Sequence, residues 1–575
     1  MAAPVTNGLP PRPKVLVPEK LSPDGLALLR SSLDVDERQG LTADELLGII
    51  PEYDALLVRS ATKVTASVLQ AASKLKVVAR AGVGVDNIVT PEDVDAATKQ
   101  GIVVVNSPSG NNVAAAEHTI ALLMCMARNI PDACSSLKSN QWERSRLVGV
   151  EVQGKTLGII GLGKVGLIVA RLAKGLGMNV NAVDPYASSA VAASASVTLM
   201  PSLAELLPTV DFLTIHTPLI ASTKGMISSA ELAQMKRGSR ILNVARGGTI
   251  DEPALLNALE TGHIAGAALD VFATEPPTSG SASAQLIAHP RVIPTPHLGA
   301  STVEAQENVS IDVCEQVLQI LGGSLPRSAV NAPLILPEEY KKLQPFVHLV
   351  EKIGSIYTQH YGSAKSPLSN RNTFDLIYEG EVSEMNNTKP LFAALIKGLM
   401  SPISKDLNVN IVNAELVARE RGIVVNEQRS RDSPSHSYSS LITLVARAAK
   451  VNGDSLGSSH LHDYIISGTC SESQPLISRI DRFATSFVPE GTLLICHNFD
   501  SPGKIGVVGS ILGKRGVNIN FMSVAPISKG KKQQKEIDSS DEALMILGVD
   551  RAVDECVVKA LVNEGGVLSA SVVSL

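Results

Sequence analysis

Apolar residues recur along this chain in short runs that are separated by stretches with helical spacing. Over the first hundred residues the runs lie within KVLVPEKL, YDALLVRS, KVVARAGVGVDNI and GIVVVNSP. Short apolar runs bounded by turn residues are typical of buried strands. Strands that alternate with helices favour a parallel sheet with helices on both faces. We therefore expect an α/β lobe over residues 14–105.

A strongly apolar helix, AAAEHTIALLMCMARNI, follows Asn111 and Asn112, either of which could cap it. Because it is apolar on nearly all sides, it should be buried in the core or at a subunit contact. A second series of predicted strands comes after it, and a long helix covers residues 302–321. This pattern predicts a second α/β lobe over 106–296 and a return to the first lobe over 297–335, with a cleft between them.

The run GLGKVG lies between a predicted strand and a helical pattern in the second lobe. Gly161 would allow the tight turn, Gly163 would let the backbone approach a pyrophosphate, and Gly166 would let helix and strand pack closely. Asp184 ends the next strand, where a carboxylate accepts the ribose hydroxyls and repels a 2′-phosphate. Glycine-rich turns alone are common, but strand, helix, second strand and acid together predict a dinucleotide site that prefers NAD.

Three further motifs follow predicted strands of the same sheet: NVARGG with Arg246, ALDVFATEP with Glu275, and TPHLGAST with His297. Ligands of open parallel sheets bind beyond the carboxyl ends of the strands. Oxidation of a secondary alcohol requires a base, and imidazole titrates near neutral pH. Glu275 could fix the tautomer of His297, and Arg246 could hold a carboxylate with two bonds. Each residue alone is more often an ordinary loop residue, but their joint placement favours a catalytic set.

These motifs resemble those of the D-isomer-specific 2-hydroxyacid dehydrogenases over residues 14–335. The resemblance implies NAD-dependent oxidation, with Arg246, Glu275 and His297 as the catalytic residues. It implies cofactor contacts from nine residues: Gly161, Gly163, Lys164, Val165, Gly166, Asp184, Thr217, Ala245 and Asp270. It implies substrate contacts from loops that face the cleft: Arg59, Ser60, Arg80, Gly82, Val83 and Asn87. Arg144 matches a residue that in relatives can reach the site of a neighbouring subunit. Arg59 or Arg80, taken alone, could equally form an ordinary structural ion pair.

The C-terminal part contains two further segments. Residues 338–490 mix strand and helix signals and resemble an intervening domain. No motif in this segment identifies residues that would bind a ligand. Residues 491–575 read strand, helix, strand, strand, helix, strand and resemble an ACT domain, with a polar stretch at 528–542 expected to be a solvated loop. In serine-sensing relatives an amino acid binds between paired ACT domains at positions that match three residues here: Asn498, Asp500 and Asn518. The chain lacks their His-x-Asn pattern, so L-serine, another amino acid or no effector all stay open.

The predicted fold is therefore α/β, with two Rossmann-like lobes, an α+β intervening domain resembling allosteric substrate-binding domains, and a ferredoxin-like βαββαβ ACT domain. This organisation resembles the long members of the family, for which the substrate is 3-phosphoglycerate and the assembly a homodimer or homotetramer. Two alternatives stay open. One is a dehydrogenase for another 2-hydroxy acid, such as glycerate or lactate. The other is an NADH-sensing corepressor that acts through protein contacts.

The composition limits which binding partners and which cellular compartment we expect. Lys plus Arg is 51 and Asp plus Glu is 56, a net charge of −5, which favours neither nucleic acid nor a membrane as partner. Six cysteines without a CxxC pair argue against a metal site or a disulfide frame and fit a reducing compartment. The N-terminal residues form neither a secretory signal nor a complete transit peptide, so we expect the cytoplasm or the plastid stroma.

Overall fold

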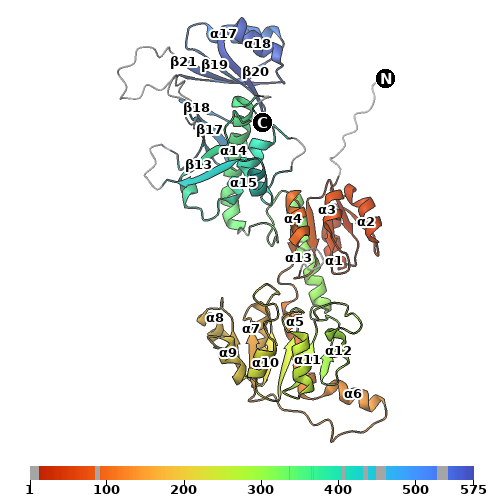
Figure 1. Ribbon diagram of the computed structural model, residues 1–575. Helices are drawn as coiled ribbons and strands as arrows, with labels where there is room; N and C mark the ends of the chain where they lie inside the picture. Colours follow the sequence, from red (N-terminus) through yellow and green to blue (C-terminus); the bar gives the residue numbers. More distant parts are fainter. Residues whose placement is uncertain are drawn as a thin grey trace, which may run out of the picture.

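The structure is a computed structural model that describes residues 12–84, 91–333, 335, 337–363, 366, 368–404, 408–430, 438–448, 462–526 and 542–575. Four sheets follow one another along the chain, and Figure 1 shows them as four bodies with the C-terminal one at the top and the second lobe at the bottom. The predicted α/β class and the two Rossmann-like lobes are confirmed.

The first lobe contains a five-stranded parallel sheet in the order β2-β1-β3-β4-β5. Its strands are β1 (Lys14–Val17), β2 (Asp34–Glu37), β3 (Ala55–Val58), β4 (Val77–Arg80) and β5 (Val103–Asn106). Its helices are α1 (Pro23–Arg30), α2 (Ala43–Ile49), α3 (Ala66–Ala71), α4 (Pro91–Lys99) and the returning α13 (Val303–Leu321), with a short 3₁₀ helix η1 (Ile50–Glu52). The sequence analysis did not predict strand β2, because it is an edge strand with the polar sequence DVDE.

The second lobe contains a seven-stranded parallel sheet in the order β12-β11-β10-β9-β6-β7-β8. Its strands are β6 (Thr156–Ile160), β7 (Asn179–Val183), β8 (Thr198–Leu199), β9 (Phe212–Ile215), β10 (Ser239–Asn243), β11 (Ile264–Leu269) and β12 (Val292–Pro294). Its helices are α5 (Asn112–Ala127), α6 (Ile130–Lys138), α7 (Lys164–Gly175), α8 (Ser189–Ser194), α9 (Leu203–Leu206), η2 (Leu207–Thr209), α10 (Ser229–Gln234), α11 (Glu252–Glu260) and α12 (Ala282–Ala288). Buried apolar clusters lie on both faces of this sheet.

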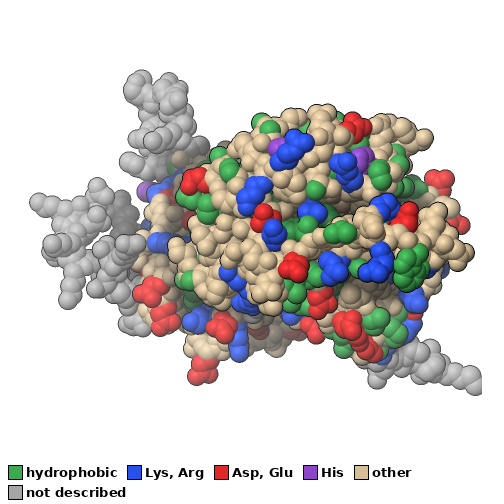
Figure 2. Space-filling view, turned by 90° about the horizontal axis from the view of Figure 1, so that it is seen from below, with side chains coloured by type: hydrophobic (Ala, Val, Ile, Leu, Met, Phe, Trp, Pro, Cys, Tyr) green, Lys and Arg blue, Asp and Glu red, His purple; other side chains and the backbone are tan. Residues whose placement is uncertain are grey.

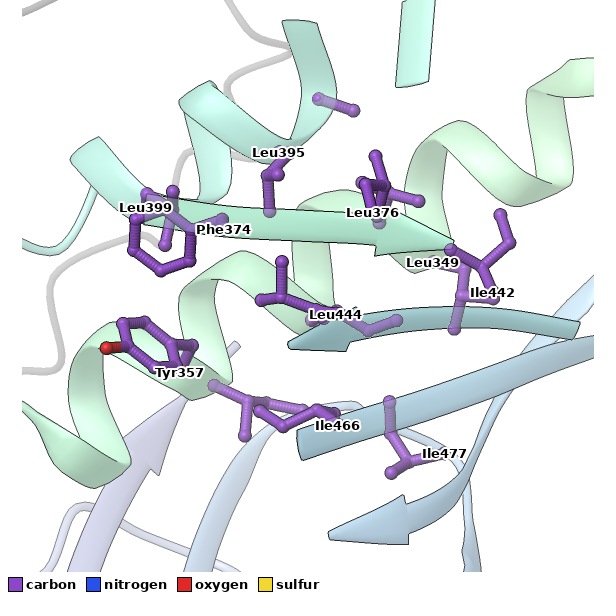
Figure 3. Close-up of a cluster of buried hydrophobic side chains, with 14 of the residues drawn as sticks. Leu349, Tyr357, Phe374, Leu376, Leu395, Leu399, Ile442, Leu444, Ile466 and Ile477 are labelled. Atoms are coloured by element: carbon purple, nitrogen blue, oxygen red, sulfur yellow. The ribbon is translucent and has the colours of Figure 1, made fainter. Parts of the chain in front are cut away.

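The intervening part contains a six-stranded mixed sheet in the order β14-β13-β15-β16-β17-β18. Its strands are β13 (Thr373–Gly380), β14 (Val424–Arg429), β15 (Ser440–Ala446), β16 (Tyr464–Ser471), β17 (Gln474–Ile480) and β18 (Phe483–Phe487). Its helices are α14 (Pro337–Tyr361), η3 (Glu381–Glu384), α15 (Lys389–Met400) and α16 (Ala414–Glu420). Figure 3 shows apolar side chains of α14 and α15 meeting those of β13, β15, β16 and β17 in one buried core.

The C-terminal part has the predicted element order and forms an antiparallel sheet in the order β20-β21-β19-β22. Its elements are β19 (Thr492–Phe499), α17 (Lys504–Lys514), β20 (Ile519–Pro526), β21 (Glu542–Val549), α18 (Glu555–Asn563) and β22 (Val567–Ser574). Along β21, Met545 and Leu547 belong to the core beneath α17 and α18, whereas Leu544 and Ile546 belong to the core of the intervening part. The central strands β19 and β21 are therefore covered on both faces, whereas the edge strands β20 and β22 keep exposed residues. The predicted loop at 528–542 lies outside the described residues except for Glu542.

Two observations concern the surface. Charged side chains of both signs are interspersed on the face of the second lobe that Figure 2 shows, so no single-sign field covers it. Among the described residues, no helix is both long enough and apolar enough to cross a membrane.

Candidate active site

The predicted catalytic residues come together beyond the carboxyl ends of β10, β11 and β12. His297 Nδ1 lies 2.7 Å from Glu275 Oε2, and Glu275 Oε1 accepts a hydrogen bond of 2.9 Å from the Phe272 N–H. The backbone of His297 has a φ of 55°, an uncommon conformation for a side-chain-bearing residue. Its N–H donates to the Asp270 carbonyl at 2.9 Å, which holds the turn in place.

The contact between His297 and Glu275 changes the proton affinity of both groups. Its hydrogen bond to Glu275 raises the pKa of His297, against the opposing effect of burial and of the charge on Arg246. Burial alone would raise the pKa of Glu275, but the hydrogen bonds from His297 and Phe272 outweigh it, and the net pKa is lowered. Glu275 is thus ionised near neutral pH and fixes a proton on Nδ1, which leaves Nε2 of neutral His297 as a proton acceptor.

A cavity of about 410 Å³ lies between the two lobes, next to His297. Its lining combines the first lobe (Val83, Gly84), the crossover into α5 (Asn111, Asn112, Ala115), and loops of the second lobe (Val165, His216, Thr217, Pro218, Leu219, Val244, Ala245, Arg246, His297, Gly299, Ala300). The expected cleft is present, and Arg246 and His297 both line it. Arg246 Nη1 donates to the Ala245 carbonyl at 2.7 Å, which orients the guanidinium.

The glycine motif has the geometry that the sequence predicts. Gly161 has a φ of 93°, and a Cβ there would lie 2.6 Å from the His216 carbonyl oxygen. A Cβ on Gly166 would lie 2.1 Å from the Gly161 carbonyl oxygen, so helix α7 and strand β6 approach too closely for any side chain. Gly163 caps α7 and faces open space, where a pyrophosphate would meet the helix N-terminus.

Two more residues fit a dinucleotide. Asp184 Oδ2 accepts from the Leu162 N–H at 2.7 Å, and Oδ1 accepts from the N–H groups of Tyr186 and Ala187 at 2.8 and 3.2 Å. These bonds orient a carboxylate that still has acceptor capacity for ribose hydroxyls. The buried Thr217 Oγ1 beside the cavity has no hydrogen-bond partner in the described part of the chain. A buried hydroxyl without a partner is costly, so it fits a ligand-binding position.

The sequence analysis gives Asp270 only as a cofactor contact, but in the structure its carboxylate is hydrogen-bonded to groups of the protein. The residue is 1 % exposed. Its Oδ1 accepts from Thr295 Oγ1 at 2.6 Å and from the Leu298 N–H at 2.7 Å, and its Oδ2 accepts from the Gly299 N–H at 2.8 Å. The carboxylate therefore organises the loop that carries His297.

Sequence reasoning missed two residues that hold these loops. His118 on α5 places Nε2 3.2 Å from Asp270 Oδ1. Glu252, buried at the start of α11, accepts from the Ala273 N–H at 2.7 Å and from Ser283 Oγ at 2.5 Å, beside the loop of Glu275. The only sequence signal for either residue is a polar side chain at a position where its helix packs against the sheet.

Two of the first-lobe residues predicted to bind substrate, Arg59 and Arg80, are held by hydrogen bonds to the loops next to the cavity. Arg80 Nε donates to the Arg59 carbonyl at 3.1 Å, and the Arg80 guanidinium also donates to the Gly84 carbonyl. Arg59 Nη1 donates to the Lys20 carbonyl at 3.2 Å. Glu19 holds the loop of Arg59 and Ser60 by accepting backbone N–H bonds. Of the predicted set only Val83 lines the cavity itself; Gly82 adjoins it, and Asn87 lies outside the described residues.

Arg144 and the predicted effector residues do not meet their expected ligands within one chain. Arg144 lies in the exposed loop after α6, which Figure 1 shows at the bottom of the second lobe, away from the first. Asn498 is near the end of β19, is 2 % exposed and has an Oδ1 without a partner among the described residues. Asn518 precedes β20, whose pairing places it at the opposite end of the sheet, next to Asp550. Asp500 follows β19 and is exposed, so these three residues could share a ligand only across two copies.

Comparisons with known proteins bear on the family. A model described as the D-isomer specific 2-hydroxyacid dehydrogenase NAD binding domain matches residues 120–299, and one described as the D-3-phosphoglycerate dehydrogenase intervening domain matches 342–459. The chain is 43 % identical over 560 residues to D-3-phosphoglycerate dehydrogenase 2, chloroplastic, of Arabidopsis thaliana, which covers 97 % of this chain and 85 % of the relative. It is 40 % identical over 564 residues to D-3-phosphoglycerate dehydrogenase of Bacillus subtilis, with 98 % and 99 % covered. The chain belongs to the D-3-phosphoglycerate dehydrogenase family.

Solved structures agree with this membership over the two lobes. A protein from Thermus thermophilus shares 33 % identity with a TM-score of 0.50, covering 55 % of this chain and 99 % of its own. A glyoxylate reductase from Paecilomyes thermophila shares 29 % identity with a TM-score of 0.50, covering 58 % and 100 %. The chain is an oxidoreductase with an NAD-binding domain, as the sequence predicts.

Proposed function

We propose that the cavity between the lobes oxidises 3-phospho-D-glycerate to 3-phosphohydroxypyruvate, the first step of serine biosynthesis by the phosphorylated route. The observation that carries the proposal is the hydrogen-bonded pair of His297 and Glu275 at the ends of the nucleotide-binding strands, with His297 and Arg246 both lining the cavity. Hydride transfer from a secondary alcohol requires a base, an oriented substrate and a site shielded from water.

Each group has a defined part in this reaction. His297 Nε2 accepts the proton of the C2 hydroxyl while Glu275 stabilises the resulting imidazolium through Nδ1–H. Arg246 binds the substrate carboxylate and the oxygen that becomes the carbonyl, because its planar guanidinium donates two parallel bonds. Bound NAD supplies the acceptor for the C2 hydride, and the keto product retains its phosphate.

The cofactor would lie along the glycine motif and the cavity floor. Gly161, Gly163 and Gly166 shape the turn, the N-terminus of α7 at Lys164 and Val165 faces the pyrophosphate, and Asp184 accepts the ribose hydroxyls. The remaining contacts would come from Thr217 and Ala245, which line the cavity, and from Asp270, which lies behind the loop of His297.

The substrate phosphate would bind near the first-lobe loops that hold Arg59, Ser60, Arg80, Gly82, Val83 and Asn87. A phosphate requires charge-assisted donors, and the two arginines are the cations in this set. Their guanidinium groups already have one or more carbonyl acceptors, and an arginine has five N–H donors in total.

A homodimer would bring one further residue to the rim of the site. The segment around α6 exposes large apolar side chains: Ile130, Leu137, Trp142 and Val148. Exposed apolar clusters of this kind mark interaction surfaces. A second copy seated there would bring Arg144 close to a neighbouring cavity. A second pairing, between ACT-like parts, would place Asn498 and Asp500 of one copy near Asn518 of the other, where an amino acid such as L-serine could bind.

The test is turnover by the purified protein, followed as NADH absorbance with 3-phosphoglycerate, D-glycerate and D-lactate. We expect turnover with 3-phosphoglycerate well above that with the two unphosphorylated acids. Arg59→Ala and Arg80→Ala should each raise the KM for 3-phosphoglycerate more than the KM for NAD. Equal effects on both constants would mean that the arginines are structural, and turnover with none of the acids would favour a binding protein.

A further inference from the structure

The loop that carries His297 is anchored on one buried carboxylate. Asp270 accepts from the Thr295 hydroxyl and from the N–H groups of Leu298 and Gly299, and its own carbonyl accepts from the His297 N–H at 2.9 Å. The residues that make these bonds lie on both sides of His297 in the sequence. The position of the imidazole therefore depends on where the Asp270 side chain is held.

His118 reaches this carboxylate from a different element. Its Nε2 lies 3.2 Å from Asp270 Oδ1 and 3.3 Å from Thr295 Oγ1, and its side chain is 19 % exposed. Because a carboxylate is an acceptor, Nε2 of His118 must carry the hydrogen. His118 lies one helical turn beyond Ala115, which lines the cavity, so α5 presents both residues on the same side.

Helix α5 is also the first element after the chain crosses from the first lobe to the second. Asn111 and Asn112 at its start line the cavity, and His118 is the side chain by which this helix contacts the anchor of the catalytic loop. A change in the position of α5 would thus be transmitted to Asp270 and then to His297.

We propose that His118 is a positioning residue for hydride transfer: its Nε2–H ties helix α5 to Asp270 and so sets the position of His297 in the cavity. The inference rests on the proposed function in one respect, namely that His297 is the base. A displacement of a reacting group by about 1 Å can cost on the order of 100-fold in rate.

The test compares His118→Leu, which removes the donor, with His118→Gln, which keeps an N–H donor at similar reach. His263→Leu is the matched control, because His263 contacts the Met235 carbonyl at 3.1 Å and lies before the opposite end of the same strand, β11. We expect His118→Leu to lower kcat by about 10- to 100-fold with little change in the Kd for NAD. His118→Gln should recover most of the loss, and His263→Leu should leave kcat near the wild-type value.

A pH profile separates positioning from loss of stability. Three charged groups face His297: Glu275, Asp270 and Arg246. If the loop loosens, the bond to Glu275 weakens, the pKa of His297 falls toward its ordinary value, and the ascending limb of kcat/KM moves to lower pH. In the double variant with Thr295→Val, the losses should be non-additive, because both donors bind the same oxygen.

Two results would overturn the proposal: an unshifted pH profile with kcat close to wild type in His118→Leu, or equal losses in His118→Leu and His263→Leu. If the wild type oxidises a different D-2-hydroxy acid, the same comparison is run with that acid, because the role of His118 does not depend on the phosphate. If no acid is oxidised, a crystal structure of His118→Leu decides: an unmoved loop at residues 295–299 would overturn the inference.

Discussion

The two halves of this chain join their parts in different ways. The catalytic lobes have separate apolar cores and face each other across a cavity, connected by the crossovers into α5 and α13. In the C-terminal half, residues of β19, β20, β21 and β22 belong to the same buried cluster as those of α14, β13 and β15. Polar contacts reinforce this second junction: Gln359 exchanges two bonds of 2.9 Å with Ser574, and His360 Nδ1 lies 2.5 Å from Ser571 Oγ.

The difference indicates which parts can move. Two lobes with independent cores can change their separation without exposing apolar surface, as a site that admits substrate and then excludes water requires. Two sheets that share a core cannot separate without exposing it. The contact between the halves is small by comparison, with Asn410 Nδ2 donating to the Gly101 carbonyl at 2.7 Å and Val412 packed on the first lobe.

The largest expected effect is a charge placed in the shared C-terminal core. Ile546→Asp buries an unpaired carboxylate at a fully buried position between the two sheets. We expect a loss of roughly 4 kcal/mol or more in the free energy of unfolding of the whole segment 337–575. Leu568→Asp, at an exposed position of β22, is the control and should have little effect. Calorimetry that shows only 492–575 melting early would contradict the shared core.

His297→Ala tests whether the chemistry belongs to the catalytic half alone. Removal of a positioned proton-transfer group costs about 100- to 10,000-fold in rate. We expect kcat to fall by that order, with NAD binding and the melting of the C-terminal half unchanged. Stopped-flow absorbance of NADH gives the rate. Turnover within a few-fold of wild type would exclude His297 as the base.

Asp184→Ala tests the cofactor end of the same half. The change removes an acceptor for the ribose and the repulsion of a 2′-phosphate, so the ratio of kcat/KM for NAD to that for NADP should fall sharply. It also releases the Leu162 N–H from its acceptor, so weaker binding of both cofactors is expected. An unchanged ratio would mean that another group selects the cofactor.

Glu275→Gln should give the smallest change in rate and a defined change in pH dependence. The carboxylate raises the pKa of His297, and oxidation requires the neutral imidazole. Without the charge, the pKa falls, and the ascending limb of kcat/KM should move to lower pH. A profile that stays in place or moves to higher pH would show that Glu275 does not control His297.

The sequence predicted the strands and helices that have a strong period. The apolar runs became β1, β3, β4 and β5, and the glycine motif became the turn between β6 and α7. Strand β2 was missed because DVDE at a sheet edge has no apolar side to detect. The order of strands and helices in the C-terminal part could be predicted from the sequence. The burial of its sheet against the intervening part could not, because a face covered by another domain of the chain has the same sequence pattern as a face at a subunit contact.

The candidate site divides in the same way. Arg246, Glu275 and His297 could be predicted because each follows a strand of one parallel sheet, and such strand ends meet at one edge. His118 and Glu252 could not, because the only sequence signal of each is a polar side chain on a helix, with no motif that marks its partner. The placement of Arg144 and of Asn518 requires a second copy of the chain, which one sequence does not define.

The central claim is that the two lobes form a complete catalytic unit and that residues 337–575 form one indivisible unit. From the sequence, a fragment of residues 1–490 is expected to keep hydride transfer. The shared core instead predicts that this cut exposes the apolar face of the intervening sheet, whereas a cut at 336 exposes none of it. The direct test is the rate of 3-phosphoglycerate oxidation and the aggregation state of fragments 1–336 and 1–490. We predict that 1–336 stays dispersed and active, and that 1–490 aggregates. A dispersed 1–490 with a cooperatively folded intervening part, or a folded and NAD-binding 1–336 without turnover, would contradict the account.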